Sequence, residues 1–188
     1  MRSFIDRLVA ARIGETDNFY RSGRGCGLRT ERLAAYLELR AEAPLLLVGE
    51  APGYRGARVS GIPFTSERQL TGSGPSEASA TIVHRVLAEL GLTESVLLWN
   101  AVPTHPGTAT SNRRPTRAEV AAGRSFAEEL ARGRQVLCVG RVAEAALGGP
   151  YIRHPSQGGA AAFAAGLRAL ATPATIAARR TPVRRFSV

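Results

Sequence analysis

Short, almost wholly apolar segments recur along the chain and predict the strands of a buried sheet. Leu45 to Val48, Val96 to Trp99 and Gln135 to Val139 each begin after polar residues or after proline or glycine. Strands that are apolar on both faces are typical of parallel sheets with helices on each side. A further short strand is expected around Tyr151 to Arg153. The pattern therefore predicts a central, mainly parallel sheet of about four strands.

Helical patterns lie between these apolar segments. The sequence predicts helices over Arg29 to Ala41, Glu77 to Leu90, Thr116 to Arg132 and about Gly159 to Leu170. The third has Thr116 and Glu119 in the spacing of a capping box, directly after Pro115, and ends before Gly133. Strands that alternate with helices in this way predict an α/β fold, arranged as a three-layer α/β/α sandwich.

Length and composition fit one domain over residues 1–188, with a core at about 43–171 and a basic tail at 172–188. We expect that tail to be either a frayed arm or a strap across the surface. The 44% of hydrophobic residues is ample for a core and rules out intrinsic disorder. No apolar run approaches the roughly 20 residues that span a bilayer, and no signal peptide is visible. We therefore expect a cytoplasmic protein of bacterial type, without a membrane partner.

The charge balance points to an anionic partner. The chain carries 25 basic residues, all of them arginine, against 15 acidic ones, for a net charge of +10. A GC-rich coding sequence would explain arginine in place of lysine, but it would not explain the surplus, and nucleic acid is the commonest partner of such a protein. Two cysteines, Cys26 and Cys138, are too few for a four-thiolate site, and Cys138 lies in an apolar run that predicts a buried structural thiol.

Polar residues and glycines follow each predicted strand, where open α/β sheets bind their ligands. The motifs are Gly-Glu-Ala-Pro-Gly at 49–53, Pro63-Phe64, a strand ending in Asn100, and His-Pro-Ser at 154–156. Each motif alone is weak. Together and in this order they resemble the uracil-DNA glycosylase superfamily, most closely its family 4 type, over roughly residues 45–170. The resemblance implies a hydrolase that flips uracil, or a related deaminated base, out of DNA and begins base excision repair.

This resemblance implies a uracil-binding pocket formed by Gly49, Ala51, Phe64 and Asn100. An enzyme that acts on a flipped base reads its Watson–Crick edge and stacks on an aromatic ring. Phe64 is the expected stacking face; the alternative is a phenylalanine that simply covers the core. The Asn100 carboxamide can accept from uracil N3–H and donate to O4, whereas cytosine presents the opposite pattern. Taken alone, an asparagine at a strand end is more often a turn former.

The expected catalytic residues are Glu50 and His154. Cleavage of the glycosidic bond develops positive charge on the sugar and negative charge on the departing base. Glu50 is expected to orient or deprotonate the attacking water and to stabilise the cation, while His154 donates to base O2. The structural alternatives are a capping or ion-paired carboxylate for Glu50 and a turn residue before proline for His154.

Contacts with the DNA backbone are expected from two segments. Arg153, Pro155, Ser156 and Gln157 resemble the segment that grips the phosphates beside the flipped nucleotide. Arg113 and Arg114 match an Asn-Arg-x-Pro element of the family, although solvated loop charges would look the same. Arg55, Arg58 and Arg141 are further candidates for the rim.

Four departures from the family shape the expectations. Thr65-Ser66-Glu67-Arg68 follows Phe64, where the family usually has a small, glycine-rich stretch. Family 4 enzymes hold an iron–sulfur cluster on four cysteines, so we expect no cluster, and no other cofactor or metal, in a chain with two. In the best-known members a bulky apolar residue follows the His-Pro-Ser segment and fills the space left by the flipped base. Here Gln157-Gly158-Gly159 follows, so the wedge is Gln157, comes from another loop, or is missing. Residues 55–60 lack the histidine of the branch that bonds covalently to DNA. We therefore expect a monomeric, monofunctional enzyme, associated with the nucleoid, that forms no covalent intermediate.

Two other functions remain open at this point. The first is a catalytically weak or inactive binder of damaged or single-stranded DNA, which the altered segment after Phe64 and the basic charge would both allow. The second is a nucleotide- or phosphate-binding α/β enzyme, which fits the glycine-rich loop alone. That reading predicts a phosphate-binding motif with a lysine, and the chain contains none.

Overall fold

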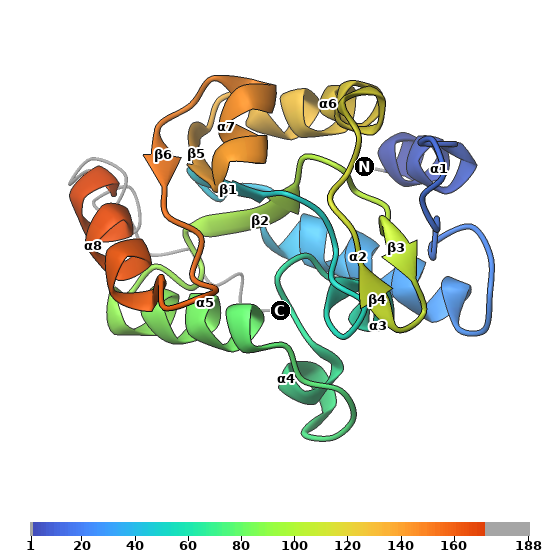
Figure 1. Ribbon diagram of the computed structural model, residues 1–188, viewed down its shortest axis with the longest axis horizontal. Helices are drawn as coiled ribbons and strands as arrows, with labels where there is room; N and C mark the ends of the chain where they lie inside the picture. The colour runs from blue at the N-terminus through green and yellow to red at the C-terminus, as the bar shows by residue number, and fades with distance from the viewer. Residues whose placement is uncertain (1, 172–188) are drawn as a thin grey trace, which may run out of the picture.

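The computed structural model describes residues 2–171 as three layers, with helices on both faces of one parallel sheet (Figure 1). The sheet has four strands in the order β2-β1-β5-β6. They are β1 (Leu45–Gly49), β2 (Val96–Asn100), β5 (Gln135–Val139) and β6 (Tyr151–Ile152). All three pairings are parallel. The predicted α/β/α sandwich with a four-stranded parallel sheet is therefore confirmed.

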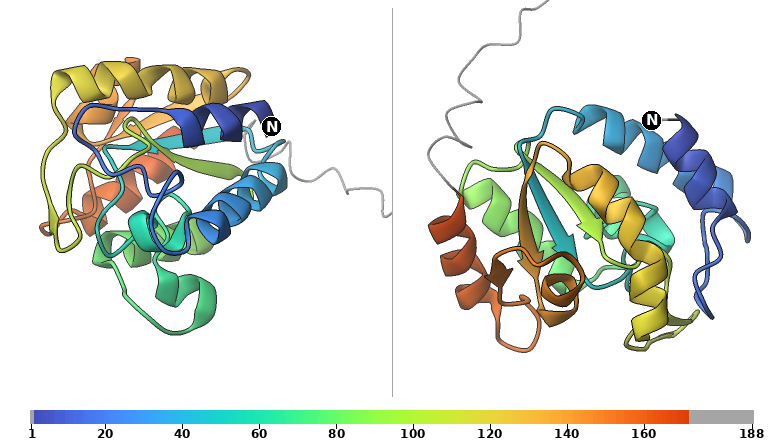
Figure 2. Two further views of the ribbon diagram at one scale, coloured as in Figure 1. Left: turned by 90° about the vertical axis from the view of Figure 1, so that its right-hand side faces the viewer. Right: turned by 90° about the horizontal axis from the view of Figure 1, so that it is seen from above.

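Side chains of the strands alternate between two hydrophobic cores, as the period of two along a strand requires. Leu46, Val48 and Trp99 face the core beneath α1 (Arg2–Ala10), α2 (Cys26–Leu39), α6 (Arg117–Ala131) and α7 (Arg141–Leu147). Leu45 and Leu47 face the core beneath α5 (Ala78–Glu89) and α8 (Ala160–Leu170). Figure 2 shows the two helical layers from the side and from above. Both faces of β1 are thus fully buried, which explains its unbroken apolar sequence.

The predicted helices form with small shifts at their ends. The capping box of α6 is present: the Thr116 hydroxyl accepts a hydrogen bond from the Glu119 amide, and the Glu119 carboxylate accepts one from the Thr116 amide. The helix α2 begins three residues before the predicted start at Arg29. Cys138 is fully buried, as expected for a structural thiol. The predicted tail at 172–188 lies outside the described residues.

Several short elements carry no sequence prediction. They are α1, α3 (Ala57–Ser60), α4 (Glu67–Thr71), α7 and the hairpin of β3 (Gly107–Thr108) with β4 (Ser111–Asn112). Helix α4 occupies the segment after Phe64 that departs from the family pattern. Its N-terminus carries a complete capping box of Ser66 and Gln69. Those polar residues therefore begin a helix rather than form the small, glycine-rich stretch usual in the family.

Candidate active site

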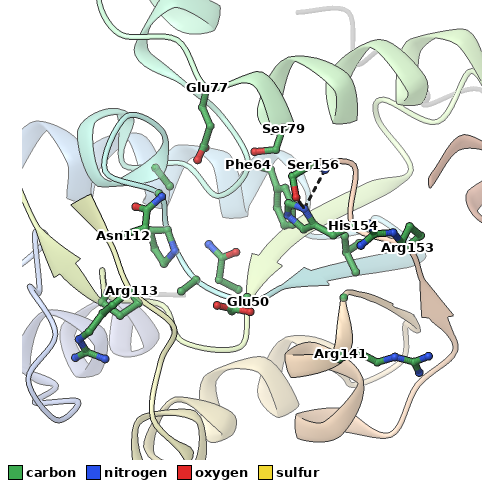
Figure 3. Close-up of a pocket in the computed structure, with 18 of the residues that line it drawn as sticks. Glu50, Phe64, Glu77, Ser79, Asn112, Arg113, Arg141, Arg153, His154 and Ser156 are labelled. Carbon is green, nitrogen blue, oxygen red and sulfur yellow. Dashed lines mark hydrogen bonds between the residues drawn. The ribbon is translucent and has the colours of Figure 1, made fainter. Parts of the chain in front are cut away.

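Most of the predicted site residues gather in one pocket of about 450 Å³ at the carboxyl ends of the strands. Its lining includes Glu50 and Ala51 after β1, Asn100 at the end of β2, and His154 after β6. Figure 3 shows the pocket, with Glu50 and Glu77 entering it from opposite sides. The parallel topology accounts for this gathering, because the carboxyl ends of all four strands lie at one edge of the sheet.

Asn100 and Phe64 line the pocket, and Gly49 lies directly beneath them. Gly49 and Asn100 are directly opposed in the β1–β2 register, each as the last residue of its strand. A side chain at Gly49 would overlap the Phe64 ring, which packs over this glycine. Phe64 has a positive φ of 54°, a conformation that costs a non-glycine residue about 1 kcal/mol or more. Only glycine at position 49 leaves space for the aromatic ring here.

The Asn100 carboxamide is buried without a protein partner. Its residue is only 4% exposed, yet the side chain forms no hydrogen bond with any other residue of the described range 2–171. Its oxygen and nitrogen are not among the fully enclosed side-chain atoms that lack a partner, so they remain accessible from the pocket. Because Asn100 lines the pocket, a ligand that enters it can supply the missing donor and acceptor. This arrangement is not that of a turn-forming asparagine.

Glu50 lies in the loop that follows β1 and faces the pocket. Its backbone carbonyl accepts a hydrogen bond from Val102, which fixes the loop against the segment after β2. Burial raises the pKa of the Glu50 carboxyl, and the positive charge of Arg114 partly opposes this rise. Its side chain forms no ion pair or hydrogen bond within residues 2–171. Glu50 is therefore a partly desolvated carboxylate that is free to act on a ligand.

His154 is held in one tautomer by its neighbour. The Ser156 amide donates to Nδ1 at 3.1 Å, and the Ser156 hydroxyl lies 2.7 Å from the same atom. Because Nδ1 accepts, the neutral ring carries its proton on Nε2. Burial lowers the pKa of His154, and the charge of Arg153 lowers it further. The pocket therefore contains a neutral imidazole whose Nε2–H can donate to a ligand.

Glu77 is a second carboxylate in the pocket that the sequence did not reveal. Side chains at Gly53 or Gly56 would collide with its carboxylate, so these two glycines let Glu77 lie against the backbone of the Glu50 loop. Burial raises the pKa of Glu77. Glu77 precedes α5 in a segment without a motif, so only the tertiary structure shows its place.

His105 and Asn112 hold the Glu50 loop in place through hydrogen bonds to its backbone, and neither was predicted to do so. His105 is fully buried, and its ring nitrogens lie 2.8 Å from the Pro52 carbonyl and 2.9 Å from the Thr108 carbonyl. Asn112 accepts a hydrogen bond from the Tyr54 amide through Oδ1. The hairpin of β3 and β4 thereby ties down the loop that carries Glu50.

The predicted DNA-binding residues occupy different positions around the pocket. Arg113 lines it but forms a two-pronged ion pair with the buried Glu119, at 2.6 and 2.7 Å, which lowers the pKa of Glu119 to about 2. Arg114 is exposed. Arg153 and Ser156 line the rim, and Gln157 is exposed with a φ of 51°.

Further arginines of the predicted rim have protein partners. Arg58 pairs with Asp17 at 2.9 Å, and the Arg141 guanidinium stacks 4.1 Å from the Tyr151 ring centre. Pro155, between His154 and Ser156, is buried.

Within residues 2–171, no group of three or more histidine, cysteine or acidic side chains is placed to hold a metal ion. In the same range, no helix is both long and apolar enough to cross a membrane.

A comparison of the sequence with models of known protein families shows the family to which this chain belongs. Residues 38–185 match the family model described as the uracil DNA glycosylase superfamily. The chain belongs to this superfamily. Its match extends over most of the sheet and every predicted motif, so the resemblance seen in the four motifs is confirmed. No curated protein matches the sequence.

A solved structure supports the same fold. The wild-type SMUG2 protein of Pedobacter heparinus superposes with a TM-score of 0.59 and 16% sequence identity. The alignment covers 89% of this superfamily member and 97% of the SMUG2 chain. At this identity the likeness establishes the α/β/α architecture alone.

Proposed function

We propose that this superfamily member is a DNA glycosylase that removes uracil, or a closely related deaminated base, from DNA. The observation that carries the proposal is the buried, unpartnered Asn100 carboxamide beside the Phe64 ring. A planar base with adjacent N–H and carbonyl groups would satisfy the amide, while its face would stack on the phenylalanine. Cytosine would leave both amide groups unpaired, which favours uracil by several kcal/mol, on the order of the cost of buried polar groups without partners.

In the proposed reaction, Glu50 acts on the sugar side of the bond. Its carboxylate orients a water molecule toward the sugar carbon and stabilises the developing oxocarbenium charge. As the bond between sugar and base breaks, the electron pair leaves with the base, and the water supplies the new C–O bond. The water proton passes to Glu50 or to solvent. Burial keeps this carboxylate poorly solvated, which strengthens its interaction with a cation.

His154 would act on the base side. The neutral ring, held by the Ser156 amide, presents Nε2–H to the base oxygen on which negative charge develops. A neutral donor suits this task because it can donate a hydrogen bond to the departing anion and keep its own proton. We also propose that the reaction requires no iron–sulfur cluster, since the chain contains only two cysteines.

The DNA backbone would run past the rim of the pocket. Arg153, Ser156 and the exposed Gln157 stand beside His154, where phosphates next to the flipped nucleotide would lie. Arg114 is exposed, and its charge acts on Glu50. Arg113 is already bound at two nitrogens by Glu119, so it fits a brace for the rim better than a ligand for phosphate. We propose that this reaction begins base excision repair of DNA.

The proposal is tested by measuring base release from labelled oligonucleotides. Single-stranded and duplex substrates would each carry one uracil, hypoxanthine or xanthine, with thymine as the control. Alkali cleavage detects the abasic site and chromatography detects the free base. We expect release of uracil, loss of that release in Glu50→Gln, and weaker binding in Asn100→Ala.

The possible results separate the candidate functions. Release of no base from any substrate would overturn the proposal, and tight, salt-sensitive binding without release would favour the inactive DNA binder instead. Normal release by Glu50→Gln or Asn100→Ala would overturn the assignment of these residues. An exposed carboxylate remote from the pocket, changed in Glu94→Gln, provides the matched control.

A further inference from the structure

A groove of about 600 Å³ lies between α6 and α7, directly beside the pocket. The two helices lie side by side on one face of the sheet (Figure 1). Arg114, Arg117, Arg124 and Arg141 line this α6–α7 groove. Four guanidinium groups in one groove create a strongly positive surface that attracts anions.

Two of these arginines are free to bind a ligand. Arg124 pairs with Glu128 at 2.6 Å and Arg141 with Glu144 at 2.7 Å. Arg114 and Arg117 are exposed, and neither side chain forms an ion pair within the described part of the chain. Unpaired guanidinium groups in an exposed groove can each bind phosphate oxygens through two N–H groups.

The floor of the α6–α7 groove is aliphatic. Val120 and Ala121 of α6 face Val142 and Ala145 of α7 across it. Ala121 and Ala145 are exposed. An apolar floor with a cationic rim gains little from duplex DNA, because the base faces of a duplex are stacked inside and a protein surface meets phosphates, sugars and base edges instead. A single strand with unstacked bases presents both an anionic backbone and apolar base faces.

The groove is continuous with the pocket. Arg141 lines both of them, and the charge of Arg114 acts on Glu50 in the pocket. A strand that places one nucleotide in the pocket therefore has the groove directly alongside for its neighbouring nucleotides. This continuity favours DNA over an acidic peptide as the occupant.

We propose that the α6–α7 groove binds a single-stranded segment of the DNA strand that carries the target nucleotide. The phosphates lie along Arg114 and Arg117, and the base faces rest on the aliphatic floor. This inference rests on the proposed glycosylase function and adds a strand preference to it: the protein binds a target in single-stranded DNA more tightly than the same target in a duplex.

Two variants test the groove without touching the pocket. Arg117→Gln removes an unpaired cation, and Ala121→Glu places an anion on the exposed floor at a helix position that tolerates glutamate at little cost. The matched controls are Arg168→Gln and Ala165→Glu on α8, which change an exposed arginine and an exposed alanine on the opposite face of the sheet. Thermal unfolding checks that all four variants fold.

Binding is measured by fluorescence anisotropy with labelled oligonucleotides at several salt concentrations. The probes are a single-stranded 15-mer with one central uracil, its duplex, and a uracil-containing trimer that is too short to fill the groove. For the 15-mer, we expect about threefold to tenfold weaker binding in Arg117→Gln and a salt slope lower by about 0.7, the value for one lost phosphate contact on a single strand. Ala121→Glu weakens binding further, and both controls match the unchanged protein.

The trimer and the duplex complete the test. Binding of the trimer should not change in any variant, and binding of the duplex should change less than that of the single strand. The proposal is wrong if the groove variants behave as the controls do, or if single strand and duplex lose affinity equally. Capture of an acidic peptide by the groove, with unchanged DNA affinity, would likewise overturn it.

Excision measured in parallel separates this inference from the proposed function. If the protein releases uracil but the groove variants bind the single-stranded 15-mer normally, the proposed role of the α6–α7 groove is wrong and the glycosylase function stands. Length-dependent loss of binding without base release from any substrate overturns the glycosylase function and leaves a single-strand binding groove.

Discussion

The two walls of the pocket are held in different ways. The Glu50 wall, residues 49–58, is bonded to distant parts of the chain: Pro52 to His105, Tyr54 to Asn112, and Arg58 to Asp17. The His154 wall, residues 153–159, is held mainly by bonds within itself, such as that between Ser156 and His154 and that from the Gly159 amide to the Ser156 carbonyl.

This difference suggests a division of tasks between the walls. A carboxylate that must lie close to the sugar carbon benefits from a fixed support, because a displacement of about 1 Å can cost about 100-fold in rate. A loop with few distant bonds, an exposed arginine and a strained Gln157 can adjust to the DNA backbone. The Glu50 wall would therefore set the rate of the chemical step. The His154 wall would contribute both to that rate and to the affinity for DNA.

The largest expected effect is that of Glu50→Gln. Loss of the carboxylate should lower the rate of uracil release by about 10²–10⁴-fold, the usual contribution of such a group. Binding of DNA should change little, because the amide keeps the size of the side chain and removes one negative charge. Single-turnover kinetics with saturating enzyme measure the chemical step. A rate within tenfold of the unchanged protein would contradict the role of the Glu50 wall.

His154→Ala should follow, with a loss of about 10²–10³-fold in single-turnover rate, as for removal of one donor to a developing anion. Burial and the charge of Arg153 lower the pKa of His154, so the ring keeps its neutral form to a lower pH than an unperturbed imidazole. Loss of activity from His154 protonation should therefore begin at a lower pH than it would for an unperturbed histidine. Ser156→Ala retains the backbone amide that fixes the tautomer, so it should lose less than tenfold.

His105→Ala tests the support of the Glu50 wall. It removes the bonds to the Pro52 and Thr108 carbonyls, which should lower the free energy of unfolding by about 1–3 kcal/mol. The displaced loop should reduce the single-turnover rate by about 10–100-fold, with little change in DNA affinity. A purely structural role would lower stability alone. Arg134→Gln, which removes bonds to the Ala43 and Leu130 carbonyls at the other end of the sheet, is the control.

Arg114→Gln should shift the pH dependence of the reaction. Glu50 must be ionised to act, so activity falls as the pH drops through its raised pKa. The positive charge of Arg114 lowers that pKa, and its removal should therefore raise it and move the acid limb of the pH–rate profile to higher pH. Arg168→Gln, a cation remote from the pocket, should leave the profile unchanged. An acid limb that moves to lower pH would contradict the coupling.

The parts of this fold that the sequence predicts are those with a repeated local signal. Strands β1, β2 and β5 are buried on both faces, so their apolar runs are unmistakable, and α6 begins at a capping box that the structure contains. Helix α7 has only seven residues, and its buried positions include two alanines, Ala143 and Ala146. So short and small a face carries no clear periodic pattern.

The same distinction applies to the site. Glu50, Asn100 and His154 follow strands, and parallel strands bring their carboxyl ends together wherever such a sheet forms. Glu77 and His105 reach the pocket or its support from a loop before α5 and from the segment before β3. Their places depend on how these segments pack, and no local pattern encodes that packing.

The smallest expected effect concerns the strained loop of the His154 wall. Gln157→Gly should raise the free energy of unfolding by about 0.5 kcal/mol, because glycine adopts the positive φ of 51° without the penalty that glutamine incurs, although it gains freedom in the unfolded chain. For a domain of this size, the melting temperature should rise by about 1–2 °C. Gln157→Ala keeps the strain and removes the polar side chain, so it separates the two effects.

If the Gln157 side chain contacts DNA, both variants should bind uracil-containing DNA about threefold to tenfold more weakly. Unchanged affinity in Gln157→Ala would mean that this side chain is only tolerated, and that the His154 wall binds DNA through Arg153 and the backbone of the loop.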